Sequence, residues 1–249
     1  MFGIPLGEFV LFVVALAAAG IMTGMLAGLF GVGGGAVIVP VLYQVFTTLA
    51  VPEAVRMHLC VGSSLAIIVP TSIQSFRTHR AKGATRIDVL KLWAAPVVAG
   101  TVLGSVLAAF APGLLLKSVF VLVAGANAIK NLAGRDDWRI GADFPSAPAM
   151  RGYGFGIGFA SALMGIGGGA ISNMIFSFHN RPIHQAVATS AGLGVLISIP
   201  GTLGYVIGGW GEPIPPELLA LGYVSLMALI LVAPITTLSA PFGARLAHR

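Results

Sequence analysis

Gly31-Val32-Gly33-Gly34-Gly35-Ala36 interrupts a long apolar segment, and Gly165-Ile166-Gly167-Gly168-Gly169-Ala170 repeats the pattern 134 residues later. Glycine interrupts helices because it loses the most conformational freedom on ordering. In hydrocarbon, an interrupted helix is tolerated only where protein or a water-filled cavity satisfies the freed backbone N–H and C=O groups. Two such breaks in corresponding places of two halves are the sequence sign of a transport site built from broken helices.

The composition is that of an integral membrane protein. Of 249 residues, 57% are hydrophobic and only 9% are charged, whereas soluble domains carry about 25% charged residues. We therefore expect a single membrane domain over residues 1–249. The net charge of +6 is small and does not indicate a nucleic-acid surface. Cys60 is the only cysteine, which excludes an internal disulfide and a CxxC metal or redox site.

The apolar pattern predicts an all-α fold, a multi-spanning bundle. A helix needs about 20 apolar residues to cross a bilayer. The predicted helical segments are 9–30, 37–50, 58–76, 89–110, 114–129, 153–164, 171–178, 187–207 and 218–238. The polar stretch 131–151 contains Pro145 and Pro148 and separates two halves.

The two halves are predicted to be inverted repeats, each opening with a helical hairpin broken by glycine. Adding 134 to Gly24, Leu29 and Gly31 lands on Gly158, Leu163 and Gly165. The repeats are expected at about 9–133 and 151–249, with the loop 134–150 between them. The first half contains a hairpin and three full crossings. The second half therefore starts from the opposite membrane face, as alternating access requires.

The cations fall on one face of this topology. If the ends of each hairpin share a face, twelve of the fourteen Lys and Arg lie with the loops 77–91, 130–151 and 179–184 and the C-terminus. The other face carries only Arg56 and Lys117. The positive-inside rule then makes the loops 77–91 and 130–151 and the C-terminus cytoplasmic, in a multi-pass protein of the cell inner membrane.

Several motifs together resemble the sulfite exporter TauE/SafE family over essentially the whole chain. They are Phe30-Gly31-Val32-Gly33-Gly34-Gly35 and its second copy, Gly62-Ser63-Ser64-Leu65, Pro70-Thr71-Ser72, and Gly243-Ala244-Arg245-Leu246-Ala247. The resemblance implies a permease that exports sulfite or moves a related sulfur oxyanion or organosulfonate. Members of that family usually continue with a last apolar helix, the partner of 114–129, so the second half looks one helix short.

The expected substrate site lies at the breaks. An interrupted helix offers free N–H groups and the positive end of its dipole, and glycine lets an anion approach the backbone closely. A small anion can thus be bound without a buried Lys or Arg. The substrate-binding candidates are Gly33, Gly34, Gly35, Gly167, Gly168, Gly169, Ser63, Ser64, Thr189, Ser190 and Asn173. The two hydroxyl pairs are included because they recur in both halves, and Asn173 because an amide in hydrocarbon demands a partner.

Purely structural interpretations of the same residues compete with a substrate site. The glycines could serve only close helix packing, in which case the chain is a non-transporting structural or assembly subunit. Single Ser and Thr hydroxyls most often bond their own helix. A dinucleotide-binding loop at Gly31 is disfavoured because the motif follows a span-length apolar run and occurs twice.

No span carries a His, Asp or Glu cluster suited to acid–base or metal chemistry, so no enzyme activity, cofactor or metal is expected. The expected partners are a small anionic substrate and the lipid bilayer, with a homodimer left open.

Overall fold

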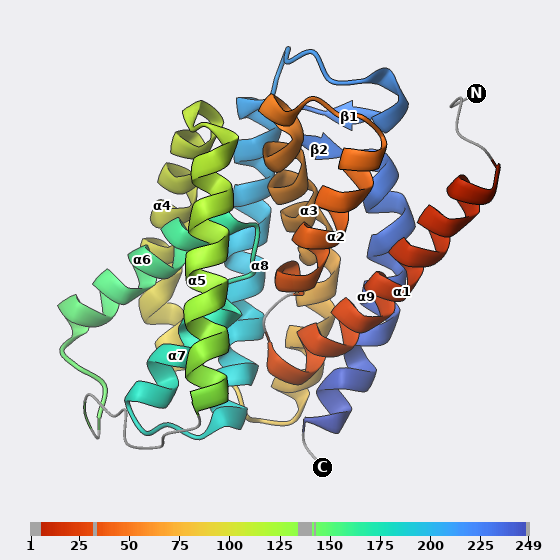
Figure 1. Cartoon of the computed structure of the whole chain (residues 1–249). Coiled ribbons are helices and arrows are strands. Elements are labelled where there is room, and N and C mark those ends of the chain that lie inside the picture. Colours follow the sequence, from red (N-terminus) through yellow and green to blue (C-terminus); the bar gives the residue numbers. More distant parts are fainter. Residues whose placement is uncertain (1–5, 32–33, 134–140, 142, 248–249) are drawn as a thin grey trace.

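The computed structural model describes residues 6–31, 34–133, 141 and 143–247. Nearly all of this part is helical (Figure 1). The helices are α1 (Leu6–Phe30), α2 (Gly35–Thr48), α3 (Glu53–Ala81), α4 (Ile87–Phe110), α5 (Gly113–Ala133), α6 (Ala147–Met164), α7 (Gly169–Phe178), α8 (Ile183–Gly208) and α9 (Leu226–Leu246). A short 3₁₀ turn (Pro216–Leu218) and a two-stranded hairpin, β1 (Ala220–Leu221) and β2 (Val224–Ser225), precede α9.

The multi-spanning all-α prediction is confirmed. Five of the described helices, α3, α4, α5, α8 and α9, are long and apolar enough to cross a membrane. In α3, 72% of the most apolar window is buried, but in α5 only 6% is, so α3 is central and α5 is peripheral. Large apolar side chains such as Phe110 and Leu238 are exposed, as expected of a surface that faces lipid chains. The short helices α2 and α7 span about 21 and 15 Å and cannot cross alone.

The predicted helix 218–238 is wrong at both ends. Residues 218–225 form the end of the 3₁₀ turn and the hairpin, and α9 runs from Leu226 to Leu246. The reason is local, because Leu219 and Gly222 both have positive φ, at 46° and 54°, which a helix cannot accommodate. The side chain of Ser225 then caps α9 by accepting a hydrogen bond from the Ala228 amide, at 3.3 Å.

The charged ends of the bundle differ. Of the eleven Lys and Arg side chains that the structure describes, nine lie where α3, α5 and α9 end and α4, α6 and α8 begin, or in the adjoining turns. We call this the basic end. The acidic end is the opposite one, with the β-hairpin and the carboxylates of Glu53 and Glu212. Residues 134–140 and 142 of the predicted loop 134–150 are outside the described residues, and α6 already begins at Ala147.

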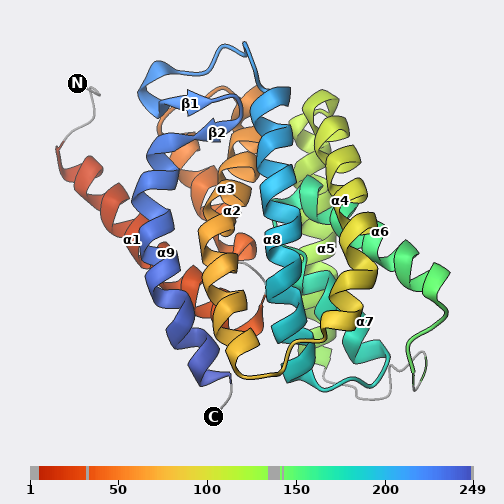
Figure 2. The same cartoon turned by 180° about the vertical axis from the view of Figure 1, so that it is seen from behind.

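The two broken helix pairs approach from opposite ends of the bundle (Figures 1 and 2). The outer ends of α1 and α2 lie on the side of the β-hairpin. The outer ends of α6 and α7 lie on the side where α8 begins. Both pairs reach the interior beside α3 and α8, which pack against each other at the centre.

Equivalent glycines hold the outer helices. The helix α1 packs along α9, and α6 packs along α4. A Cβ atom on Gly243 would collide with the carbonyl oxygen of Met25, and one on Gly104 would lie 2.7 Å from that of Phe159. Met25 and Phe159 are separated by the same 134 residues as the glycine motifs. These contacts are the small-residue packing that membrane helices use in place of the hydrophobic effect.

Replacing Gly243 by alanine is expected to destabilise the protein, because over-packing costs about 1–3 kcal/mol. Gly125→Ala in α5 is the matched control. Nothing lies within 4 Å of a Cβ at that position, and alanine is the better helix former by about 1 kcal/mol. Thermal unfolding of the two purified variants in the same detergent measures the difference. Equal midpoints would contradict the packing role.

Candidate functional site

The two glycine breaks have the same backbone conformation. Gly31 and Gly34 have φ of 63° and 77°, and the equivalent Gly165 and Gly168 have φ of 69° and 76°. The left-handed region is open to glycine and costs other residues about 1–2 kcal/mol. In both breaks the second of these glycines is the residue from which the short helix starts, α2 after Gly34 and α7 after Gly168.

The starts of α2 and α7 lack side-chain caps. A glycine occupies the N-cap position of each helix, so no side chain bonds the first amides. The first N–H groups of a helix have no partner within it, and the helix dipole places positive potential there. Gly35 and Gly169, the first residues of the two helices, are buried. Each break therefore presents donors and positive potential to the protein interior.

The breaks touch. A Cβ atom on Gly35 would collide with the carbonyl oxygen of Gly165 and would lie 2.9 Å from the Cα of Ile166. The start of α2 thus lies directly on the backbone of the second break. Gly33 falls outside the described residues. Gly167, Gly168 and Gly169 are buried together at the second break.

Serine hydroxyls bind each break across the halves. Ser64 on α3 donates to the carbonyl oxygen of Gly165 at 2.7 Å. Ser190 on α8 lies near two carbonyl oxygens, that of Gly31 at 3.1 Å and that of Val187 at 2.9 Å. The hydroxyl of each half is therefore within hydrogen-bond distance of a carbonyl oxygen at the break in the other half.

The neighbouring hydroxyls bind helix starts in the same crossed pattern. Ser63 accepts a hydrogen bond from the Ser225 amide at 2.8 Å. Thr189 accepts one from the Arg86 amide at 3.0 Å. Ser225 and Arg86 are the N-cap residues of α9 and α4. All four hydroxyls expected to bind substrate thus make bonds that join the two halves.

Asn173 lies beside the first break, although it belongs to α7. Its Nδ2 donates to the carbonyl oxygen of Phe30, the last residue of α1, at 2.6 Å. Its Oδ1 is buried and has no partner in the described part of the chain. The amide therefore caps α1 and leaves one acceptor for a further donor.

Two hydroxyls that the sequence reasoning missed lie next to the breaks. The γ-methyl group of Thr23, which shares a Cβ with the hydroxyl, packs directly against Gly34, and the Oγ of Ser161 lies 3.5 Å from the position of a Cβ on Gly168. Both hydroxyls are buried without a partner among the described residues. Other hydroxyls in the spans, such as that of Thr101, donate to their own helix. No sequence signal separates Thr23 and Ser161 from these, because the difference depends on which neighbour is close in space.

The site is made of hydrogen-bond donors. Its groups are amides at helix starts and hydroxyls, which donate hydrogen bonds to an oxyanion without carrying a full charge. Within the described ranges, no group of three or more His, Cys, Asp or Glu side chains could hold a metal ion.

A pocket reaches the first break from the basic end. It has a volume of about 230 Å³. Its lining residues are Leu29, Phe30, His79, Ile183, His184, Val187 and Ala247. A Cβ atom on Gly31 would collide with the carbonyl oxygen of Val187, so the pocket wall is in contact with the break.

The acidic end is covered by the β-hairpin. Tyr223 at its turn is buried and stacks on His58, with ring centroids 4.8 Å apart. Its amide donates to the Tyr205 carbonyl at 3.0 Å, and its carbonyl packs on Gly62. Burial, with the nearby Glu212 carboxylate, raises the pKa of the Tyr223 phenol. The hairpin therefore packs on both α3 and α8 at this end.

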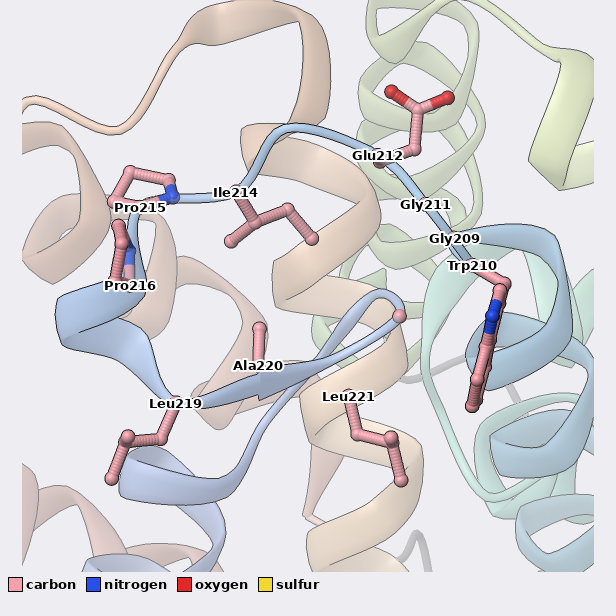
Figure 3. Close-up of a pocket in the computed structure, with 11 residues that line it drawn as sticks. Gly209, Trp210, Gly211, Glu212, Ile214, Pro215, Pro216, Leu219, Ala220 and Leu221 are labelled. Carbon is pink, nitrogen blue, oxygen red and sulfur yellow. The ribbon is translucent and has the colours of Figure 1, made fainter.

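A second pocket, of about 320 Å³, lies within the loop 209–222 at the same end. Figure 3 shows the Glu212 carboxylate pointing away from strand β1, with Trp210 on the other side of the loop. No residue of either break lines this pocket, so it is not part of the candidate site.

Ser64→Ala is expected to destabilise the fold, because it leaves the buried Gly165 carbonyl without its hydroxyl donor. An unsatisfied buried polar group costs about 1–3 kcal/mol. Ser239→Ala is the control, since Ser239 donates to Ile235 within its own helix and that carbonyl keeps its helical position. Thermal unfolding of both variants is the measurement. A Ser64 variant no less stable than the control would remove the structural role of this bond.

The chain is similar to known membrane proteins over most of its length. The sulfite exporter TauE/SafE family matches residues 16–249. A probable membrane transporter protein of Haemophilus influenzae is 31% identical over 242 residues, which cover 94% of this chain and 88% of the relative. One of Methanocaldococcus jannaschii is 31% identical over 230 residues, covering 92% and 84%. One of Bacillus subtilis is 26% identical over 228 residues, covering 79% of each.

No solved structure matches the chain. The relatives confirm the prediction of a membrane transporter rather than an enzyme. The family resemblance predicted from the glycine motifs is also confirmed, because the match includes both breaks and the helices around them. The chain belongs to the sulfite exporter TauE/SafE family of membrane transporters.

Proposed function

We propose that this transporter moves a small anion, sulfite or a related sulfur oxyanion or organosulfonate, out of the cytoplasm by alternating access at the paired breaks. The observation that carries the proposal is the contact between the two breaks, Gly35 on Gly165, at two helix starts capped only by glycine. The family name supports sulfite as the first substrate to test.

The chemistry of the site favours an oxyanion. Burying an isolated charge is costly unless it is paired or hydrogen-bonded. Amides at the starts of α2 and α7 provide such bonds, and the hydroxyls of Thr23 and Ser161 have no partner in the described structure. We therefore add these two hydroxyls to the predicted substrate-binding set. Ser63, Ser64, Thr189 and Ser190 are proposed to position the breaks.

Alternating access is supported by the equivalence of the halves. Crossed bonds of the same kind hold both breaks, and the broken pairs approach from opposite ends (Figure 1). We infer inverted repeats at about 9–133 and 151–249. The pocket near Gly31 opens at the basic end, and the β-hairpin covers the acidic end. The described state is then open to the basic side.

Orientation and driving force follow from charge. The positive-inside rule makes the basic end cytoplasmic, in the cell inner membrane. A membrane potential that is negative inside drives an anion outward by about 2.3 kcal/mol per charge for each 100 mV. Export therefore needs no proton relay.

The rival function is a non-transporting structural or assembly subunit. It is favoured by the glycines that only pack helices, such as Gly104 and Gly243. The two functions differ in whether a ligand binds at Gly34 and Gly168. A packing role needs no ligand, whereas a permease must bind one.

Sulfite is expected to raise the thermal unfolding midpoint of the purified protein, because a ligand that binds only the folded state stabilises it. At a hundred times Kd the gain is about 2.7 kcal/mol. The panel contains sulfite, thiosulfate, sulfate and sulfoacetate, with taurine as a zwitterion of no net charge and sodium chloride at equal ionic strength as the salt control. If no anion of the panel exceeds the salt control, the structural-subunit function is favoured.

Gly34→Ala and Gly168→Ala are expected to reduce sulfite efflux about tenfold or more, since each adds a Cβ at a positive φ. That methyl would collide with Thr23 at the first break and with Ile197 at the second. A tenfold loss corresponds to only about 1.4 kcal/mol. Efflux is measured from proteoliposomes that hold a potential negative inside.

The control for backbone strain is Gly83→Ala. Gly83 has a φ of 71°, but nothing lies within 4 Å of its Cβ position. The Gly83→Ala variant should keep efflux near the wild-type rate, although its backbone strain at positive φ is similar. Unchanged efflux in both break variants would place the site elsewhere.

A further inference from the structure

The two cations of the acidic end meet at one tyrosine. Lys117 on α5 donates from Nζ to the Tyr43 hydroxyl at 2.8 Å, and its Nζ lies 4.7 Å from the ring centroid. The Arg56 guanidinium on α3 lies 5.5 Å from the same centroid. Tyr43 itself is on α2. Three helices thus bring together the only Lys and Arg that the described chain places at this end.

Their charge is only partly balanced. Glu53 lies 3.6 Å from Lys117, but its side chain is 79% exposed, and an exposed pair is worth little. Arg56 makes no ion pair among the described side chains, and its Nε and Nη2 both donate to the Val51 carbonyl, at 3.0 and 2.6 Å. The cluster therefore carries an excess positive charge in a half-buried place.

Helix capping explains part of this arrangement. Cations near the end of α2 interact favourably with its dipole, and Arg56 binds a carbonyl there. Capping does not explain Lys117, whose partner is a phenol oxygen. That hydroxyl still has its own proton to donate, and a hydrogen bond received from an ammonium strengthens it as a donor. Lys117, Tyr43 and Arg56 thus place hydrogen-bond donors around one aromatic ring.

The cluster is connected to the breaks by a single helix. α2 begins at Gly35, which contacts the second break, and Tyr43 follows eight residues later, about 12 Å along the axis. An anion leaving the breaks toward the acidic end would move along this helix, where a second set of donors would receive it.

We propose that Tyr43, Arg56 and Lys117 form a second site for a small oxyanion, at the acidic end of the transport path. This inference rests on the proposed function. The site makes binding from the acidic side depend on these residues and leaves binding from the basic side to the breaks and the pocket near Gly31.

The test compares sulfite transport from each side, in right-side-out and inverted vesicles from the same cells. Lys117→Gln should raise the KM for sulfite presented to the acidic end about tenfold, as expected for losing a charged hydrogen bond. The KM from the basic end should stay within about twofold. Tyr43→Phe should shift the KM in the same direction, and Lys117→Arg should restore most of it.

Lys130→Gln is the matched control. Lys130 lies on the same helix, 4.4 Å from the centroid of the Phe178 ring, at the opposite end. It should leave the KM from the acidic side unchanged. Thermal unfolding of each variant separates a loss of stability from a loss of binding.

The outcomes separate the two proposals. Wild-type vesicles that transport no anion of the panel overturn the proposed function, and this inference with it. Wild-type transport with an unchanged KM for Lys117→Gln overturns this inference alone and leaves the cluster as a helix cap. A KM raised equally from both sides also overturns it, because a local site must act from one side.

Discussion

The structure depends on one constraint: backbone groups freed by a broken helix must find partners where no water is available. Both breaks meet it in the same way. Ser64 and Ser190 each lie on a central helix and bond a carbonyl of the break in the other half. Each break therefore receives a hydrogen bond from the other half of the chain. The two halves need each other, which explains why the breaks lie in the interior and in contact rather than at the lipid surface.

The same pattern of hydrogen bonds between the two halves extends to the ends of the bundle. The Ser63 hydroxyl accepts a hydrogen bond from the amide of the N-cap residue of α9. The Thr189 hydroxyl accepts one from the amide of the N-cap residue of α4. The first bond ends on strand β2, and the second ends on the last residue of the short connection between α3 and α4. The pairs of outer helices repeat the pattern in their packing, with Gly104 and Gly243 in equivalent contacts. In the proposed carrier, these paired contacts would fix the helices in a similar way at the two ends of the bundle.

Several features of the fold were readable from the chain because they rest on local physics. Span-length apolar runs predicted the crossing helices, and the glycine motifs marked where two of them stop. The predicted start of α9 was wrong because an apolar run does not reveal a turn that needs positive φ at Leu219 and Gly222. For the hydroxyls, recurrence of Ser63-Ser64 and Thr189-Ser190 correctly signalled equivalent positions. It did not reveal their partners, which are carbonyls and amides of the opposite half. Thr23 and Ser161 gave no signal at all.

The sequence by itself determined the membrane class, the all-α multi-spanning fold, the two breaks and the uneven distribution of cations. These depend on composition and on residue order along one helix. Only the tertiary structure decided that the breaks touch, that Asn173 caps α1 and that Arg56 and Lys117 meet at Tyr43. Those contacts join residues far apart in the chain, and small changes in helix rotation would exchange their partners. A hydroxyl that bonds its own helix and one that has no partner among the described residues look alike in the sequence. Packing alone sets the difference between them.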